Sequence, residues 1–222
     1  MHPVLGLPWL ELLHRFDWTR SLTVESHRFE IALVVIENHA GYDQSLFYRI
    51  AFGDPYMAAL VRERFANVDR VKVLQEDFTR CHIRSHMFSF VEGERLLDAK
   101  SPHAKVVSNI PFNISTDVIK QLLPLGDIFS EVILLLQEEA ALRFVDSSSR
   151  TSEYRPINIF INFYSDPEYK FKVPRTNFFP QPKVDAAIVA FRLKQSVDYP
   201  PISSTKSFFS MGTDNMHLSL LD

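Results

Sequence analysis

The chain has 222 residues, of which 46% are hydrophobic, and a formal net charge of −3. That length supports one sizeable hydrophobic core, and the charge excludes a strong long-range field that would capture nucleic acid unaided. The longest apolar runs, residues 31–36 and 132–136, are far shorter than the roughly 18–20 residues that cross a bilayer, so we expect no membrane segment. Cys81 is the one cysteine, which excludes an intramolecular disulfide.

The first fifty residues form a divergent segment whose role the sequence does not define. Residues 30–37 (EIALVVIE) predict a buried strand because the run is apolar and rich in β-branched side chains. The segment lacks the basic start and the small-residue cleavage site of a secretory signal, and acids such as Glu11 and Asp17 disfavour an organelle transit peptide. We therefore expect no targeting signal in residues 1–50.

Strand and helix patterns alternate from Tyr48 onward. Apolar, β-branched runs predict strands, and apolar side chains at helical spacing predict the helices between them. This alternation is typical of βαβ units, so we predict an α/β fold with a parallel sheet. The predicted strands are residues 50–53, 71–75, 105–110 and 132–137, and the predicted helices are residues 55–65, 116–123 and 138–145.

The C-terminal part of the chain has a different pattern. Residues 156–164 fit either a strand or a helix by periodicity, and both alternatives stay open. Residues 169–173 and 186–193 predict a closing antiparallel pair of strands. From Gln195 onward, prolines and a run of serines are typical of a linker. We therefore expect a core domain over residues 51–194 and a linker-like tail over residues 195–222.

The segment VVSNIPFNIST, which ends at Thr116, brings three unlike groups together where a strand ends. Asn109 offers a side-chain carbonyl, Pro111 fixes the backbone beside a second carbonyl, and Phe112 offers a flat ring. At the carboxyl end of a strand, these groups suit the binding of an amino group on a planar base. The alternative is a plain turn, in which Pro111 ends the strand, Phe112 packs into the core, and Ser115 or Thr116 caps the next helix.

Three ordered motifs resemble those of the rRNA adenine N6,N6-dimethyltransferase family. They are NIPFNIST at residues 109–116, LQEEAA at residues 136–141, and Val173-Pro174 followed by FPQPKVD at residues 179–185. The motif sequences are most similar to those of plant plastid members, and the similarity extends over about residues 54–210. The resemblance implies a Rossmann-like class I methyltransferase sheet that uses S-adenosyl-L-methionine to dimethylate adenine N6 in small-subunit rRNA.

The resemblance also implies where the protein works and what accompanies it. It favours a plastid (chloroplast) location, with the cytoplasm or the mitochondrion as alternatives. The expected partner is small-subunit rRNA or the pre-ribosomal small subunit. We expect a monomer that needs neither a metal nor a membrane.

The base-binding residues follow from the same resemblance. The amino nitrogen of adenine is a poor nucleophile until hydrogen-bond acceptors hold its protons, a task implied for Asn109 and the carbonyl beside Pro111. Phe112 is implied as one face of an aromatic clamp, and Phe179, with Phe178 as the alternative, as the other. Stacking worth about 1–3 kcal/mol per ring helps to offset the cost of taking the base out of its stack.

The residues implied for cofactor binding are less complete than those implied for base binding. The resemblance implies that Asp77 and Asn109 contact the cofactor, and Asp54 follows the strand whose family acid holds the ribose. That acid belongs two positions earlier, where this chain has Phe52. The six glycines are scattered, so the glycine-rich loop of the family is missing, and residues 31–41, a strand followed by ENHAG, are the best substitute. We expect a sheet that is incomplete at its N-terminal side, in a truncated or misjoined form without the family's helical domain.

Other polar groups favour structural roles. Cys81, His82 and His86 have partial metal-ligand spacing but no fourth ligand, so we predict no metal site. Glu138 and Glu139 fit the start of a helix, where the macrodipole favours acids. Six basic residues flank the aromatic loop and form either an RNA-facing patch or ordinary solvated surface. They are Arg150, Arg155, Lys170, Lys172, Arg175 and Lys183.

Two functions from different classes therefore stay open. The first is the dimethyltransferase, and the second is a non-catalytic RNA-binding or ribosome-assembly protein that kept the base pocket and lost the cofactor pocket. Another amino-methyltransferase is a third option, against which the motif at residues 179–185 counts. The missing glycine loop and Phe52 predict that this chain binds S-adenosyl-L-methionine weakly or not at all.

Overall fold

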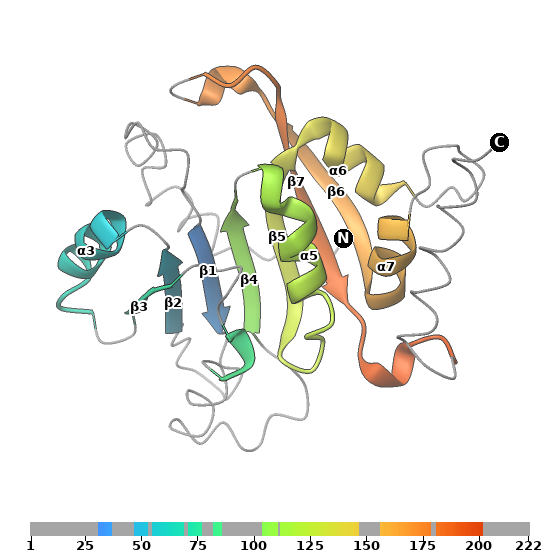
Figure 1. Ribbon diagram of the computed structural model, residues 1–222, viewed down its shortest axis with the longest axis horizontal. Coiled ribbons are helices and arrows are strands. Elements are labelled where there is room, and N and C mark those ends of the chain that lie inside the picture. The colour runs from blue at the N-terminus through green and yellow to red at the C-terminus, as the bar shows by residue number, and fades with distance from the viewer. Residues whose placement is uncertain are drawn as a thin grey trace, which may run out of the picture.

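A computed structural model describes residues 31–36, 47–52, 55–68, 71–76, 82–85, 104–110, 112–146, 156–178 and 181–201. These residues form a seven-stranded sheet with the order β3-β2-β1-β4-β5-β7-β6 (Figure 1). The strands are β1 Ile31–Ile36, β2 Phe47–Phe52, β3 Val71–Gln75, β4 Ala104–Asn109, β5 Phe129–Gln137, β6 Ser165–Val173 and β7 Ala186–Leu193. The helices are α3 Pro55–Arg64, α5 Ser115–Leu122, α6 Glu138–Val145 and α7 Pro156–Tyr164, with short 3-10 turns η2 Phe112–Ile114, η3 Arg175–Asn177 and η4 Ser196–Asp198.

The interior strand β1 runs antiparallel to both of its neighbours. Strands β2 and β3 are parallel to each other, as are β4 and β5, whereas β1 pairs antiparallel with both β2 and β4. A parallel connection needs a crossover of about a dozen residues or more, usually a helix. Only residues 37–46 separate β1 from β2, so an antiparallel pair is the geometry that this connection permits. The predicted parallel pairing is confirmed for β2 with β3 and for β4 with β5, whereas the antiparallel β1 lies in the segment predicted to be divergent, outside that prediction.

Most of the other predicted elements are confirmed. The predicted strand at residues 71–75 and helix at residues 138–145 have the observed bounds, and the antiparallel β6–β7 pair forms as predicted. Strand β2 is longer than predicted, since it begins at Phe47. Residues 156–164 form a helix, which decides between the two alternatives. Its buried Asn158 donates to the carbonyl oxygens of Arg143 and Asp146, and so ties α7 to the end of α6.

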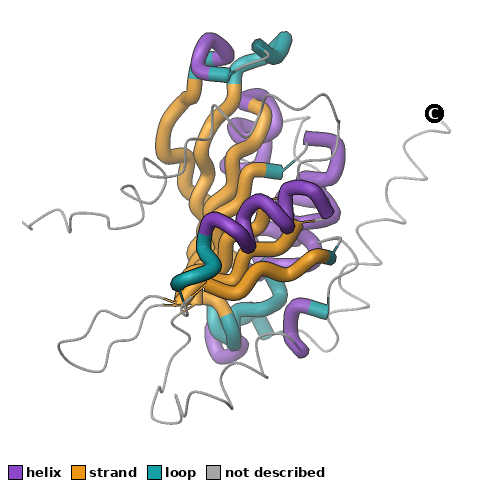
Figure 2. Tube along the Cα trace, turned by 90° about the vertical axis from the view of Figure 1, so that its left-hand side faces the viewer, coloured by secondary structure: helices purple, strands orange, loops and turns teal. Residues whose placement is uncertain are grey.

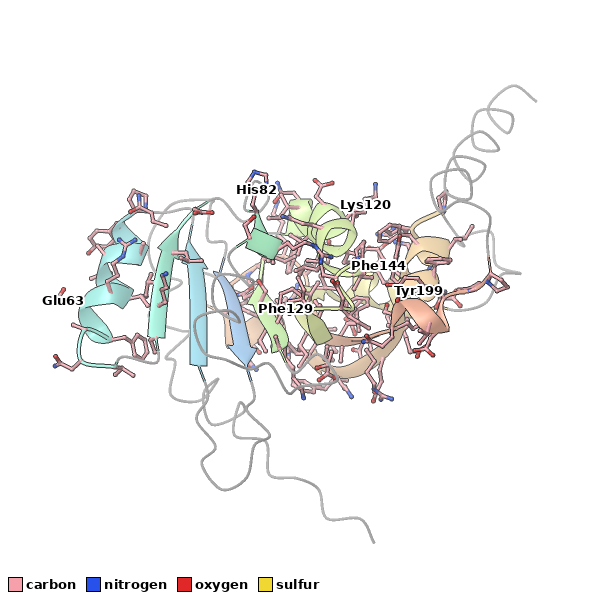
Figure 3. All side chains as sticks on the ribbon, turned by 90° about the horizontal axis from the view of Figure 1, so that it is seen from below. Glu63, His82, Lys120, Phe129, Phe144 and Tyr199 are labelled. Carbon is pink, nitrogen blue, oxygen red and sulfur yellow. The ribbon has the colours of Figure 1, made fainter. Side chains whose placement is uncertain are left out.

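The hydrophobic core lies between the strands β4, β5 and β7 and the helices α5, α6 and α7, which cover one face of this part of the sheet (Figures 1 and 2). Alternate residues of each strand enter the core, as the period of a strand requires. Phe129 and Phe144, labelled in Figure 3, are buried there. The core also contains Val106, Val132, Leu134, Leu136, Val189 and Phe191 from the strands and Val118, Ile119, Leu122 and Ile161 from the helices.

The residues that follow β7 fold back onto the domain. The Gln195 side chain donates to the Gly126 carbonyl oxygen at 2.7 Å, and the Lys194 amine donates to the Asn162 carbonyl oxygen at 2.7 Å. The Tyr199 ring lies 5.3 Å from that of Tyr164, and burial raises the pKa of both phenols. Gln195 and Tyr199 thus contact the domain, whereas residues 196–198, Pro200 and Pro201 are exposed. Among the residues that the structure describes, no helix combines the length and apolar character needed to cross a bilayer.

Candidate functional site

The sheet changes winding direction between β1 and β4. From β1 the chain adds β2 and then β3 on one side, whereas from β4 it adds β5 on the other. In open α/β sheets, ligands bind outside the carboxyl ends of the strands at such a switch point. Asn109 ends β4 at this point and pairs in register with Ile31, the first residue of β1. The sequence motif around Asn109 therefore lies at the end of the sheet where β2, β3, β4 and β5 end, beside the amino end of β1.

The Asn109 side chain lies on the face of the sheet opposite to α5, α6 and α7. Ala104 and Val106 belong to the core on the helix side, so the alternation of β4 directs Lys105, Val107 and Asn109 to the other face. Asn109 is half-buried, and its neighbour in register on β5 is the half-buried Leu135. The amide is thus partly screened from water beside an apolar neighbour, which strengthens its hydrogen bonds to a ligand.

The segment after Asn109 separates a buried residue from an exposed ring. Ile110 is 3% exposed and enters the core, whereas Phe112 is 36% exposed at the start of η2. The Ser115 hydroxyl donates to the Phe112 carbonyl oxygen at 3.0 Å, and α5 has no side-chain cap. The alternative of a plain turn with Phe112 in the core is therefore wrong, because Ile110 takes that place. Pro111 lies outside the described residues.

The loop between β6 and β7 rises from the same end of the sheet. Ala186 pairs with Gln137, the last residue of β5, and with Val173, the last residue of β6. The loop therefore lies at the same end of the sheet as the carboxyl end of β5, with β5 between β7 and β4. Phe178 is half-buried near the start of this loop, and the candidate Phe179 lies outside the described residues.

Asp185 closes the base of this loop with three hydrogen bonds. Its carboxylate accepts from the Arg175 backbone N–H at 2.9 Å and from the Lys172 amine at 2.8 Å, and its backbone carbonyl accepts from the Glu138 N–H at 3.0 Å. The Lys172 amine also reaches the Glu138 carboxylate at 2.8 Å. The hydrogen bond from Lys172 holds the pKa of Asp185 below its usual value, with the Arg175 N–H contributing, while both carboxylates raise the pKa of Lys172.

This network was not found from the sequence. Glu138 lies in the first turn of α6, as predicted, but its role as a partner of Lys172 was missed. The signal was the charge complementarity between Lys172, at the end of one strand of a predicted pair, and Asp185, just before the other. Lys172 and Arg175 were predicted only as parts of a basic patch.

Two of the three cofactor candidates are not described by the structure. Asp54 and Asp77 lie outside the described residues. Because β1 is antiparallel to β2 and β4, these two strands run in the same direction, so β2 ends at Phe52 on the side of Asn109. The proposed substitute loop after β1 is wrong: Ile36 pairs with Ala104, the first residue of β4, at the opposite end of the sheet.

The remaining polar candidates are dispersed. His82 is exposed, while Cys81 and His86 lie outside the described residues. The part of the chain that the structure describes contains no group of three or more residues able to hold a metal ion. Of the basic residues, Arg150 and Arg155 also lie outside this part, and Lys170 pairs with Glu168 at 2.7 Å.

Comparisons with known proteins identify the family of the chain. The family model described as ribosomal RNA adenine dimethylase matches residues 53–217. Over 158 residues the chain is 70% identical to a chloroplastic ribosomal RNA small subunit methyltransferase of Arabidopsis thaliana, a match that covers 71% of this chain and 46% of the relative. It is 38% identical over 127 residues to ribosomal RNA small subunit methyltransferase A of Protochlamydia amoebophila, covering 56% of this chain and 43% of that protein.

Solved structures share the fold. A dimethyladenosine transferase from Plasmodium falciparum superimposes with a TM-score of 0.52 at 24% identity, covering 66% of this chain and 47% of its own. The 23S rRNA methyltransferase ErmE gives 0.51 at 21% identity, covering 73% and 58%. The predicted Rossmann-like class I methyltransferase fold is thereby confirmed. The chain spans about half the length of the curated relatives it matches.

Proposed function

The chain belongs to the ribosomal RNA adenine dimethylase family, and on that basis we propose that it dimethylates adenine N6 in small-subunit rRNA. The methyl donor in this proposal is S-adenosyl-L-methionine, which supplies an electrophilic methyl group when bound. One observation carries the proposal: the half-buried Asn109 ends β4 at the switch point, and the exposed Phe112 follows three residues later.

The residues around Asn109 suit the capture of an adenine. A base that leaves its stack costs a few kcal/mol, which stacking on the Phe112 ring offsets by about 1–3 kcal/mol. The Asn109 side-chain carbonyl then accepts a proton of the exocyclic amine, and the carbonyl of Ile110, beside Pro111, is proposed as the second acceptor. Phe179 on the β6–β7 loop is proposed as the opposing ring. These contacts orient the amine, and most of their value comes from alignment.

The cofactor side fits less well. Asp54, Asp77 and Asn109 are the proposed contacts, but β2 ends in Phe52 where an acid is needed for a ribose. The carboxyl end of β1 lies at the end of the sheet opposite to Asn109, so the segment that follows β1 is not placed to serve as the cofactor loop. We therefore expect methylation to require S-adenosyl-L-methionine well above micromolar concentration.

This mismatch favours a second candidate function. A protein that binds the same adenine without methylating it would act in rRNA binding or ribosome assembly. The antiparallel β1 is the specific observation that supports it, since the base site does not depend on the direction of that strand.

The experiment combines methylation with cofactor binding. The chain is incubated with unmethylated small ribosomal subunits and millimolar S-adenosyl-L-methionine, and N6,N6-dimethyladenosine is measured by mass spectrometry. The enzyme should form product, and Asn109→Ala should lower the rate roughly 10²–10³-fold, the scale for removing one preorganised hydrogen-bonding group. Absence of product with intact rRNA binding would favour the second candidate. Calorimetry that gives micromolar cofactor affinity would contradict the expected mismatch.

We also propose a plastid location, because a chloroplastic protein is 70% identical over the matched region. In this proposal the protein is a monomer, and residues 51–194 provide the methyltransferase core together with β1.

A further inference from the structure

We propose that Lys172 is a positioning residue that holds the base of the β6–β7 loop, residues 174–185, in a fixed place relative to Asn109. The inference rests on the proposed function of this site, because it concerns the loop that supplies the second aromatic ring. Lys172 lies outside the motifs shared with the family.

Asp185 and Arg175 define the base of the loop as a closed unit. The Arg175 backbone N–H donates to the Asp185 carboxylate at 2.9 Å, and the Arg175 guanidinium donates to the Lys183 carbonyl oxygen at 3.0 Å. Both bonds join the segment that follows β6 to the segment that precedes β7. They fix the shape of its base, but they do not connect that base to the rest of the site.

Lys172 supplies that connection. Its partner in register is Ala187, a core residue on the helix side, so the lysine side chain rises on that side over a small neighbour. From there its amine lies 2.8 Å from the Asp185 carboxylate and 2.8 Å from the Glu138 carboxylate. One cation thus joins the end of the loop to the first residue of α6.

Strand β5 connects Glu138 to the neighbour of Asn109. Glu138 directly follows Gln137, the last residue of β5, and two residues earlier Leu135 pairs in register with Asn109. The base of the loop is therefore tied to the strand beside Asn109 through side chains and backbone alone. Alignment matters here, because a misplacement of about 1 Å can cost on the order of 10²-fold in rate.

The three charged side chains are partly exposed, which indicates that they hold the loop base in place without contributing much to overall stability. The side chains of Lys172, Glu138 and Asp185 are 47%, 27% and 28% exposed. Ion pairs in such surroundings contribute little to the free energy of unfolding. A role in overall stability is thus small, whereas the local order of the loop base depends on these contacts.

The experiment compares three variants of the full chain. Lys172→Met keeps the length of the side chain and removes its charge, and Lys172→Arg restores a cation. Lys170→Met is the matched control, because Lys170 lies two residues away on the same strand and pairs with Glu168 rather than with the loop. The first readout is hydrogen exchange of the Arg175 and Asn177 amides, with thermal unfolding recorded in parallel.

We expect Lys172→Met to accelerate exchange of these amides while the midpoint of thermal unfolding stays nearly unchanged. It should also weaken binding of a short adenine-containing single-stranded RNA about tenfold, because the loop no longer holds its place. Lys172→Arg should restore both properties, and Lys170→Met should change neither.

Two results would overturn the proposal: unchanged exchange at Arg175 and Asn177 in Lys172→Met, or an equal change in Lys170→Met. Exchange is measured without RNA or methyl donor. If the unsubstituted chain fails to bind the RNA, the proposed function fails alone, and faster exchange in Lys172→Met still supports the positioning role.

Discussion

The two halves of the sheet are built differently. Strands β4, β5, β7 and β6 carry three helices on one face, and their inward side chains form one continuous core. Strand β3 and helix α3 bury little: among their described side chains only Ala58 and Val61 are buried, while Tyr56 is 62% and Leu60 42% exposed. The proposed base site lies on the well-packed half, and the strands that precede the proposed cofactor residues Asp54 and Asp77 lie on the other.

The family match divides the chain at nearly the same place. It begins at residue 53, so β1 and β2 lie outside it, although β1 is an interior strand between β2 and β4. A strand can fill that position in either direction, because both directions satisfy the backbone hydrogen bonds of its neighbours. The sheet can therefore form with β1 in either direction, but the direction of β1 determines at which end of the sheet the following loop lies.

The largest expected effect tests the packing difference directly. Leu134 in β5 is fully buried, and Leu74 in β3 is half-buried at the margin of the same core. Leu134→Ala should lower the free energy of unfolding by about 2–5 kcal/mol, the usual range for a cavity in a rigid core. Leu74→Ala should cost roughly 1 kcal/mol, because less apolar area is lost from the interior. Urea unfolding of both variants gives the two values. Equal losses would mean that the two halves are equally well packed.

The strands and helices of the well-packed half were largely predictable. Residues 132–137 and 138–145 show a short apolar run followed by helical spacing, and local pattern alone defines such elements. The direction of β1 was not predictable in this way, because an apolar run such as IALVVI has the same pattern in a parallel and an antiparallel strand. The length of its connection to β2 was the available signal.

The segment after β7 offers a second test, with a smaller effect. Gly126 lies against the Lys194 backbone, and a methyl group there would overlap the Lys194 carbonyl oxygen. Backbone atoms cannot rotate away, so Gly126→Ala should displace this segment and cost about 1–3 kcal/mol, as overpacking does. Thermal unfolding measures the loss. Gln195→Ala is the control, since it removes the hydrogen bond to Gly126 without adding an atom, and it should cost less.

A third test concerns the exposed ring of the base site. Phe112→Ala should weaken binding of an adenine-containing single-stranded RNA by about 1–3 kcal/mol, the value of one stacked base. Its effect on stability should be small, because Phe112 already lies partly in solvent. Phe171→Ala is the matched control: that ring is 51% exposed on β6, away from the end of β4. Equal weakening by both substitutions would contradict a specific stacking role.

The candidate site was predictable in part. Asn109 and Phe112 were proposed because Asn-x-Pro-aromatic interrupts a strand pattern, and the structure places Asn109 at the end of β4 and Phe112 at the start of η2. The network of Glu138, Lys172 and Asp185 was not found, because its members come from α6, β6 and the residue before β7, and only the folded sheet brings these together. Charge pairs across strands leave no mark in local periodicity.

The smallest expected effect is a shift in one titration. Lys172, and then the Arg175 N–H, holds the pKa of Asp185 below its ordinary value of 3.8. A carboxyl group with a lowered pKa in the folded state stabilises that state at pH values above its ordinary pKa. The contribution is lost as the pH falls through the lower folded value. Nuclear magnetic resonance of the Asp185 carboxyl carbon should give a midpoint below 3.8, and Lys172→Met should raise it. Lys170→Met should instead raise the midpoint of Glu168, whose pKa is lowered chiefly by Lys170. An Asp185 midpoint that does not respond to Lys172→Met would show that the loop base is held by its own two bonds rather than by the link to α6.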